Sequence, residues 1–238
     1  MPGAPRIPMI TEAALCRLLT WLSPAFPVGG FSYSHGIEYA VETGLVSDRA
    51  SLAGWVEGSV RFGAGRVDAG LFLAAHRAVL AEDRAALRLV SDFGDAWRGT
   101  AETALESSAQ GTAFLSAVRS VWPHPMLDAW AAELAESRRA PAYAVAVAVG
   151  AALIGVDERP ALAAYLTSFT AALISAAVRL IPLGQTDGLR TAAALEPIIL
   201  HSINDALQRP WHDLGSAAFA VDLTSARHET QYTRLFRS

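Results

Sequence analysis

The chain has six histidines, the side chains best suited to bind a metal ion. They are His35, His76, His124, His201, His212 and His228. No two of them lie three to five residues apart, so the sequence lacks the paired histidines that bind zinc from one helical face. His201 and Asp205 are four residues apart and could face one ion together, but a single pair supplies too few ligands. We expect no metal site made by this chain alone. A helical bundle that binds a ligand or metal through His201 and Asp205 remains the alternative interpretation.

Motifs for nucleotide binding and covalent catalysis are missing as well. All 19 basic residues are arginine, which excludes the lysine of a phosphate-binding loop and any lysine nucleophile. Gly63-Ala-Gly65 lacks the third glycine of a dinucleotide-binding loop, because Asp68 occupies that position. Neither Ser32 nor Ser34 has the flanking glycines of a nucleophile elbow. We therefore expect no catalytic residue and no cofactor bound by this chain.

Composition narrows the class of protein further. The 238 residues are 52% hydrophobic and 18% charged, with a net charge of −4. A chain this apolar can bury a core and is not disordered, and its mild acidity argues against nucleic acid as a partner. The only cysteine, Cys16, excludes an internal disulfide. We expect an intracellular protein with a flexible N-terminal tail over residues 1–10.

The elements that must position any functional residue are predicted to be helices. Apolar residues recur every three or four positions, and prolines and glycines separate these runs. Helices are predicted over residues 11–22, 33–43, 48–62, 68–81, 83–97, 100–121, 126–137, 142–154, 160–180, 188–207 and 214–223. Residues 142–149 alternate alanine and valine with the period of a strand, but the helical surroundings favour a helix. We expect one all-α domain, a bundle of about ten helices with short Pro/Gly breaks, over residues 11–223.

One apolar run, residues 160–178, approaches the roughly 20 residues that a membrane span needs. Its large apolar side chains follow one helical stripe, whereas alanine, serine and threonine fill the other faces. The stripe consists of Leu162, Leu166, Phe169, Leu173 and Leu180. This pattern is typical of a helix that packs against other helices, so we expect no membrane span.

Two further features concern packing between helices and contacts with other chains. Gly111, in the middle of a predicted helix, favours a close approach between two helices. The C-terminal tail, residues 224–238, combines arginines with Tyr232, Leu235 and Phe236, which are residue types enriched at interfaces. Leaving Leu235 and Phe236 in water would forgo about 1.5–3 kcal/mol of burial each. The tail therefore either folds back on its own domain or docks on another chain.

Five segments, in this order, resemble the UreF family of urease accessory proteins. They are Ser23–Glu38 (SPAFPVGGFSYSHGIE), Glu106–Gly111 (ESSAQG), Ala140–Val145 (APAYAV), Ser175–Gly188 (SAAVRLIPLGQTDG) and Arg227–Ser238 (RHETQYTRLFRS). The resemblance extends over nearly the whole chain. It implies an all-helical, cytoplasmic, non-catalytic protein that bridges UreD (UreH in some bacteria) and the GTPase UreG. In that family the complex uses GTP hydrolysis to insert nickel into apo-urease, and UreF proteins commonly form homodimers.

The resemblance also implies roles for individual residues. Six tail residues should dock on the UreD-like partner and become ordered there: Arg227, Glu229, Tyr232, Arg234, Leu235 and Phe236. A second group should lie on a dimer surface or a UreG-facing surface: Phe31, Tyr33, His35 and Glu38. Gln185 and Asp187 are candidates for polar contacts at a helix break.

Overall fold

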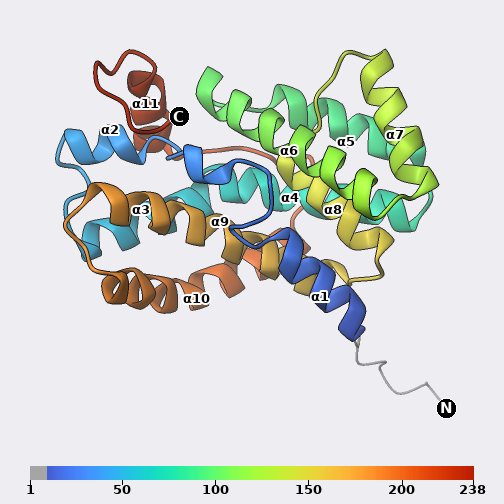
Figure 1. Ribbon diagram of the computed structural model, residues 1–238, viewed down its shortest axis with the longest axis horizontal. Coiled ribbons are helices and arrows are strands. Elements are labelled where there is room, and N and C mark those ends of the chain that lie inside the picture. The colour runs from blue at the N-terminus through green and yellow to red at the C-terminus, as the bar shows by residue number, and fades with distance from the viewer. Residues whose placement is uncertain (1–9) are drawn as a thin grey trace.

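The computed structural model describes residues 10–238, and all regular secondary structure in that part of the chain is helical (Figure 1). The helices are α1 (Glu12–Trp21), the 3₁₀-helix η1 (Gly30–Ser32), α2 (Ile37–Glu42), α3 (Arg49–Phe62), α4 (Ala64–Leu80), α5 (Arg84–Ala96), α6 (Ala101–Val121), α7 (Pro125–Glu136), α8 (Tyr143–Leu153), α9 (Glu158–Leu180), α10 (Gln185–Gln208) and α11 (Phe219–His228). The predicted all-α domain is confirmed. The expected flexible tail lies outside the described residues, apart from residue 10.

Two predicted helices are misplaced. The helix expected from Tyr33 begins only at Ile37, because His35 (φ 54°) and Gly36 (φ 78°) adopt left-handed backbone conformations that a right-handed helix cannot contain. The last helix, expected over residues 214–223, spans Phe219–His228 instead. The expected boundary between domain and tail after residue 223 therefore falls inside α11.

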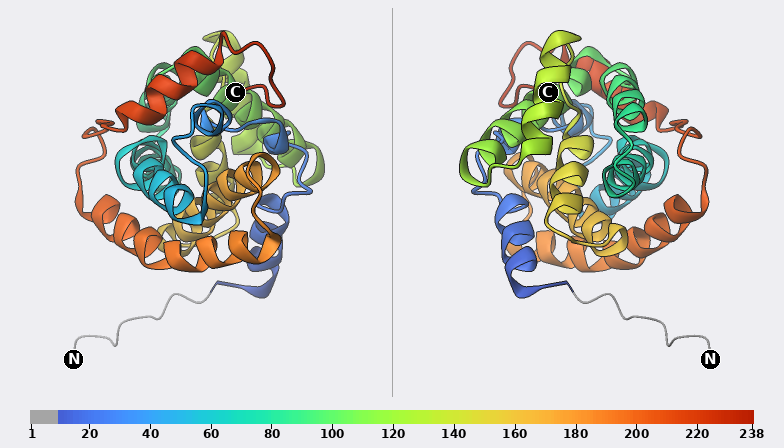
Figure 2. Two further views of the ribbon diagram at one scale, coloured as in Figure 1. Left: turned by 90° about the vertical axis from the view of Figure 1, so that its left-hand side faces the viewer. Right: turned by 90° about the vertical axis from the view of Figure 1, so that its right-hand side faces the viewer.

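Tertiary contacts explain why the last helix begins late. Residues 209–218 connect α10 to α11, which lie on opposite sides of the bundle (Figure 2). Within this connection Leu214 is buried against Gly70 of α4. The Ala217 N–H and the Ser216 hydroxyl both donate to the carbonyl of Phe62. These contacts hold the segment extended across the bundle. The last helix therefore begins at residue 219.

The core centres on α8, the helix with a strand-like sequence. Every residue from Ala144 to Ala152 is buried, and α8 packs against both α4 and α6. A helix covered on all sides needs no polar face, which is why its sequence shows no helical amphipathicity. Gly111 of α6 meets the carbonyl of Pro141 just before α8, and a side chain there would overlap that carbonyl. A close approach at Gly111 is confirmed, but the neighbour is the chain just before α8 and not a residue within a second helix.

Helix α9 joins this core to a smaller one. By length and composition α9 could cross a membrane, but half of its most apolar 18-residue stretch is buried inside the fold. Leu162 and Leu166 are fully buried in the main core. Leu173 and Ile174 belong to the second core, which α9 shares with α2, α3 and α10. Ile37 at the start of α2 is buried there, and this fixes the position of the segment just before it.

Candidate functional site

The C-terminal segment, residues 229–238, folds back on its own chain (Figure 1). It lies against the N-terminal loop, which we define as residues 23–36. The Arg237 N–H donates to the Ser32 carbonyl at 2.7 Å, and the Ser34 N–H donates to the Ser238 main-chain oxygen at 2.5 Å. The Ser34 hydroxyl donates to that same oxygen. The structure thus brings together the two segments that the sequence marked separately as interaction surfaces.

Glu38, in the first turn of α2, holds the middle of the C-terminal segment. One carboxylate oxygen accepts the Leu235 N–H at 2.6 Å, and the other accepts the Phe236 N–H at 3.0 Å. The residue is only 7% exposed. Hydrogen bonds to an ionised acceptor are stronger than neutral ones, so this carboxylate orders two consecutive residues of the segment.

A second carboxylate, Glu102 of α6, lies close by. Its oxygens contact His228 Nδ1 at 2.8 and 3.0 Å and Arg234 Nη1 at 3.2 Å. Burial raises the pKa of Glu102, against the opposing effects of His228 and Arg234. His228 Nε2 lies 2.9 Å from Glu38, so the histidine bridges the two carboxylates.

The side chain of Phe236 is anchored in the fold. It is 4% exposed, and the guanidinium of Arg179, in the last turn of α9, lies 4.3 Å from its ring centroid. Arg179 also donates to the Phe31 carbonyl at 2.9 Å. A cation over an aromatic face is attracted by the ring's electron density, so Arg179 ties α9, the N-terminal loop and the C-terminal segment together.

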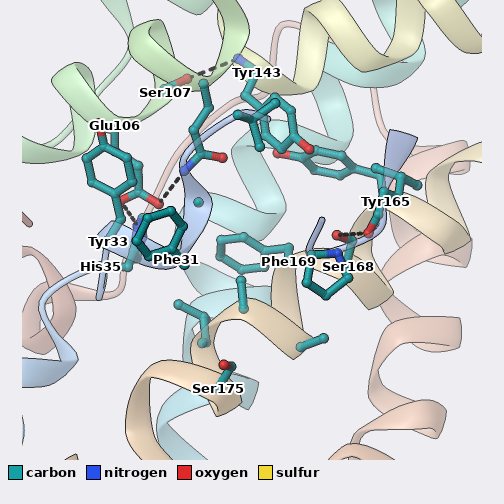
Figure 3. Close-up of a pocket in the computed structure, with 18 of the residues that line it drawn as sticks. Phe31, Tyr33, His35, Glu106, Ser107, Tyr143, Tyr165, Ser168, Phe169 and Ser175 are labelled. Carbon is teal, nitrogen blue, oxygen red and sulfur yellow. Dashed lines mark hydrogen bonds and ion pairs between the residues drawn. The ribbon is translucent and has the colours of Figure 1, made fainter. Parts of the chain in front are cut away.

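Beneath the N-terminal loop lies a cavity of about 210 Å³. Figure 3 shows Tyr33, His35 and Glu106 on one side of it, Tyr165 on the other, and Phe169 between them. His35 Nδ1 lies 3.3 Å from the Glu106 carboxylate. Burial by itself would lower the pKa of His35, but the hydrogen bond and the charge of Glu106 outweigh it and raise that pKa. The histidine is therefore a fixed, polar part of the cavity wall.

A buried network completes the wall of the cavity. Asp68 of α4 accepts from Arg98 Nη1 at 2.9 Å through one oxygen and from the Tyr165 hydroxyl at 2.7 Å through the other. Burial raises the pKa of Tyr165 well above its ordinary value, and Asp68 raises it further. These three residues come from distant parts of the chain, and no sequence spacing links them. Among residues 10–238 no group of three or more His, Cys, Asp or Glu side chains could hold a metal ion.

The predicted interaction residues divide into exposed and buried sets. The exposed set, with Phe31 at 73%, Leu235 at 65% and Tyr232 fully exposed, consists of Phe31, Arg227, Glu229, Tyr232, Arg234, Leu235 and Gln185. The buried set consists of Tyr33, His35, Glu38 and Phe236, which support the surface from beneath. Asp187 is half-buried at the start of α10, where it pairs with Arg190. In the described chain no hydrogen bond or ion pair joins Gln185 or Asp187 to the C-terminal segment.

Sequence reasoning missed three residues of this site. Glu102 is an ordinary charged residue of a long helix, and Arg179 and His228 lie within two of the five family-like segments but are assigned no role there. No local signal marks them, because their partners lie far away in the sequence: Glu102 and His228 are separated by 126 positions. Only the packing of α11 against α2 and α6 brings them together.

The alternative site at His201 and Asp205 has a different character. His201 is exposed on α10, and the Asp205 carboxylate lies 2.6 Å from Arg209 Nη1 and 3.5 Å from Arg66 Nη1. Two guanidinium groups already neutralise this carboxylate, so the local charge disfavours a cation. The geometry gives no support to a metal site at this pair.

Comparisons with known proteins agree with the residue patterns. The model of the UreF family matches residues 46–196. The chain is 50% identical over 227 residues to the urease accessory protein UreF of Granulibacter bethesdensis, covering 95% of each protein. It is 48% identical to the protein of that name from Magnetococcus marinus, covering 97% of this chain and 100% of the relative. For the protein of that name from Rhodopseudomonas palustris (strain HaA2) the identity is 49%, with both chains fully covered.

Proposed function

Because this chain belongs to the UreF family of urease accessory proteins, we propose that it is a non-catalytic adaptor in urease maturation. In this proposal it bridges a UreD/UreH-like protein and the GTPase UreG within the cytoplasmic complex that inserts nickel into apo-urease. Nickel and GTP are handled by the complex, and this chain binds no cofactor of its own. It acts as a homodimer and meets apo-urease through the complex.

The observation that carries the proposal is the presentation of Tyr232 and Leu235. Both side chains point away from the fold, whereas the neighbouring backbone is held by Glu38 and the neighbouring Phe236 is buried. Aromatic and arginine side chains dominate binding energy at interfaces. The resemblance implied that this segment becomes ordered on the UreD-like partner, whereas here it is already folded against its own chain. A segment that is already ordered loses less conformational entropy when a partner binds, which favours affinity. This arrangement suits a recognition element better than a free tail would.

The proposal assigns surfaces to partners. The UreD-like protein docks on the exposed residues of the C-terminal segment and on Arg227 at the end of α11. Phe31 and the N-terminal loop form the dimer or UreG-facing surface, with Tyr33, His35 and Glu38 supporting it from within. Gln185 and Asp187 provide polar contacts at the break between α9 and α10.

Capture of purified partners tests the proposal. The chain is mixed with UreD-like and UreG-like proteins, with and without nickel and guanine nucleotide. We expect Tyr232→Ala combined with Leu235→Ala to abolish capture of the UreD-like protein. Leu80→Ala is the matched control, because Leu80 is 62% exposed at the end of α4 and belongs to neither surface. Equal capture by the double variant and the control would refute the assignment of the C-terminal segment.

A further inference from the structure

His228 is the one histidine of the described chain with a carboxylate at each ring nitrogen. It is fully buried at the end of α11. Nε2 faces Glu38 of α2 at 2.9 Å, and Nδ1 faces Glu102 of α6 at 2.8 Å. The imidazole thus stands between two carboxylates that belong to different helices and that are themselves only 7% exposed.

Those same carboxylates hold three consecutive residues of the C-terminal segment. Glu102 binds the Arg234 side chain, and Glu38 accepts the N–H groups of Leu235 and Phe236. No hydrogen bond joins His228 itself to any of the three. Whatever His228 does for the segment, it does through the two carboxylates.

Electrostatic repulsion between the two carboxylates explains how His228 can order the C-terminal segment without contacting it. Without the imidazole, two buried carboxylates would face the gap that it leaves. Arg234 has a side chain that is 41% exposed and contacts only Glu102, so it cannot take the place of the imidazole between the two carboxylates. A buried charge that loses its partner is strongly unfavourable. The carboxylates would move apart or turn toward solvent, and the N–H groups of Leu235 and Phe236 would lose their acceptor.

We infer that His228 is a positioning residue for the interaction surface: it fixes Glu38 and Glu102 side by side and thereby holds Leu235 and Phe236 in their ordered arrangement, with the Leu235 side chain exposed. The assignment of that surface to a partner rests on the proposed function. The positioning itself is a property of the isolated chain and is measured there.

Amide hydrogen exchange on the full-length protein tests the inference. We expect His228→Ala to speed exchange of the Leu235 and Phe236 amides by about tenfold or more, because both lose an ordered acceptor. The amides of α8 in the main core should keep their protection. His76→Ala is the matched control, since His76 is also fully buried but bonds to the Val156 carbonyl in another part of the fold. If His76→Ala speeds the two amides equally, the effect is general loosening and the inference is wrong.

A rescue experiment separates charge from packing. In the double variant His228→Ala with Glu102→Gln, one of the two facing charges is gone while Glu38 can still hold the segment. We expect the Leu235 and Phe236 amides to regain most of their protection, and Glu102→Gln alone to change it little. If the double variant exchanges as fast as His228→Ala, the histidine acts only by filling space and the inference fails.

Two further outcomes keep this inference distinct from the proposed function. If His228→Ala does not fold, His228→Gln replaces it. Its single amide nitrogen can take the place of only one of the two ring nitrogens, so we expect exchange faster than in the wild type, and wild-type exchange would overturn the inference. If His228→Ala frees the segment but the UreD-like protein is still captured, the positioning stands and the docking assignment fails. If exchange is unchanged, the positioning is wrong whatever the capture result.

Discussion

Glu38 and His228 are separated by 190 positions in the sequence, yet their side chains meet at 2.9 Å in the interior of the protein. The contact joins α2 to the end of α11, and α11 packs along α2 just beside it. Gly36, immediately before α2, allows this approach, because a Cβ at that position would lie 2.9 Å from the Ser225 N of α11. The N-terminal loop and the C-terminal segment therefore form one structural unit, and a substitution in either should alter the conformation of both.

Gly36→Ala should destabilise the protein more than Gly44→Ala. Both glycines have positive φ, 78° and 76°, so both variants incur the left-handed strain of roughly 1–2 kcal/mol. Gly44 has nothing within 4 Å of an added Cβ, whereas at Gly36 the added Cβ meets Ser225 and Thr224. Urea denaturation of both variants measures the difference. Equal losses would show that α11 does not constrain Gly36.

Gly111→Ala should lower the free energy of unfolding by about 1–3 kcal/mol, the typical cost of overpacking. The added methyl would overlap the Pro141 carbonyl and push α6 away from the chain entering α8. Gly58→Ala in α3 is the control, since an added Cβ there meets nothing within 4 Å. Alanine favours helix over glycine, so this variant should gain up to about 1 kcal/mol. Thermal unfolding of both variants checks that Gly111→Ala lowers the stability and Gly58→Ala raises it.

The contribution of His35 to stability should depend on pH. Glu106 raises the pKa of His35 in the folded protein despite the opposing effect of burial. A raised folded-state pKa stabilises the fold below the ordinary value near 6.5, and this stabilisation is lost as the pH rises through the folded-state value. The stability difference between the wild type and His35→Gln should therefore shrink as the pH rises above the ordinary histidine pKa of about 6.5. Burial lowers the pKa of His76, so His76 changes the stability of the fold with pH in the opposite direction. The difference in stability between the wild type and His35→Gln is therefore the quantity to measure, because the contribution of His76 cancels in it.

Phe236→Ala and Tyr232→Ala should separate folding from recognition. Phe236 is buried beneath Arg179, so its truncation should weaken the docking of the C-terminal segment by about 1.5–3 kcal/mol and expose the segment to proteolysis. Tyr232 is fully exposed, so its truncation should change the free energy of unfolding by no more than about 0.5 kcal/mol. The same truncation should weaken partner capture. Proteolysis of the segment after Tyr232→Ala would contradict this division.

Helical periodicity predicted most of the helices, because each has its own apolar stripe and its own proline, glycine or cap at the ends. The exception is instructive. The alternating sequence of α8 carries no helical stripe, since the helix is buried on every side and needs none. The segment 214–218 was predicted as helix from local pattern, but its contacts with Gly70 and Phe62 hold it extended. Local propensity is weak enough for such contacts to override it.

By itself the sequence determined the helical class, the absence of a phosphate-loop lysine, and the five segments that resemble a known family. It left open whether the C-terminal segment folds back, because the choice depends on partners far away in the chain. The tertiary structure decided that point through Glu38, Glu102 and Arg179, which lie on three different helices and whose partners in the C-terminal segment are not indicated by any local pattern. Burial and electrostatic pairing depend on distance in space, and spacing along the chain does not encode that distance between residues of different helices.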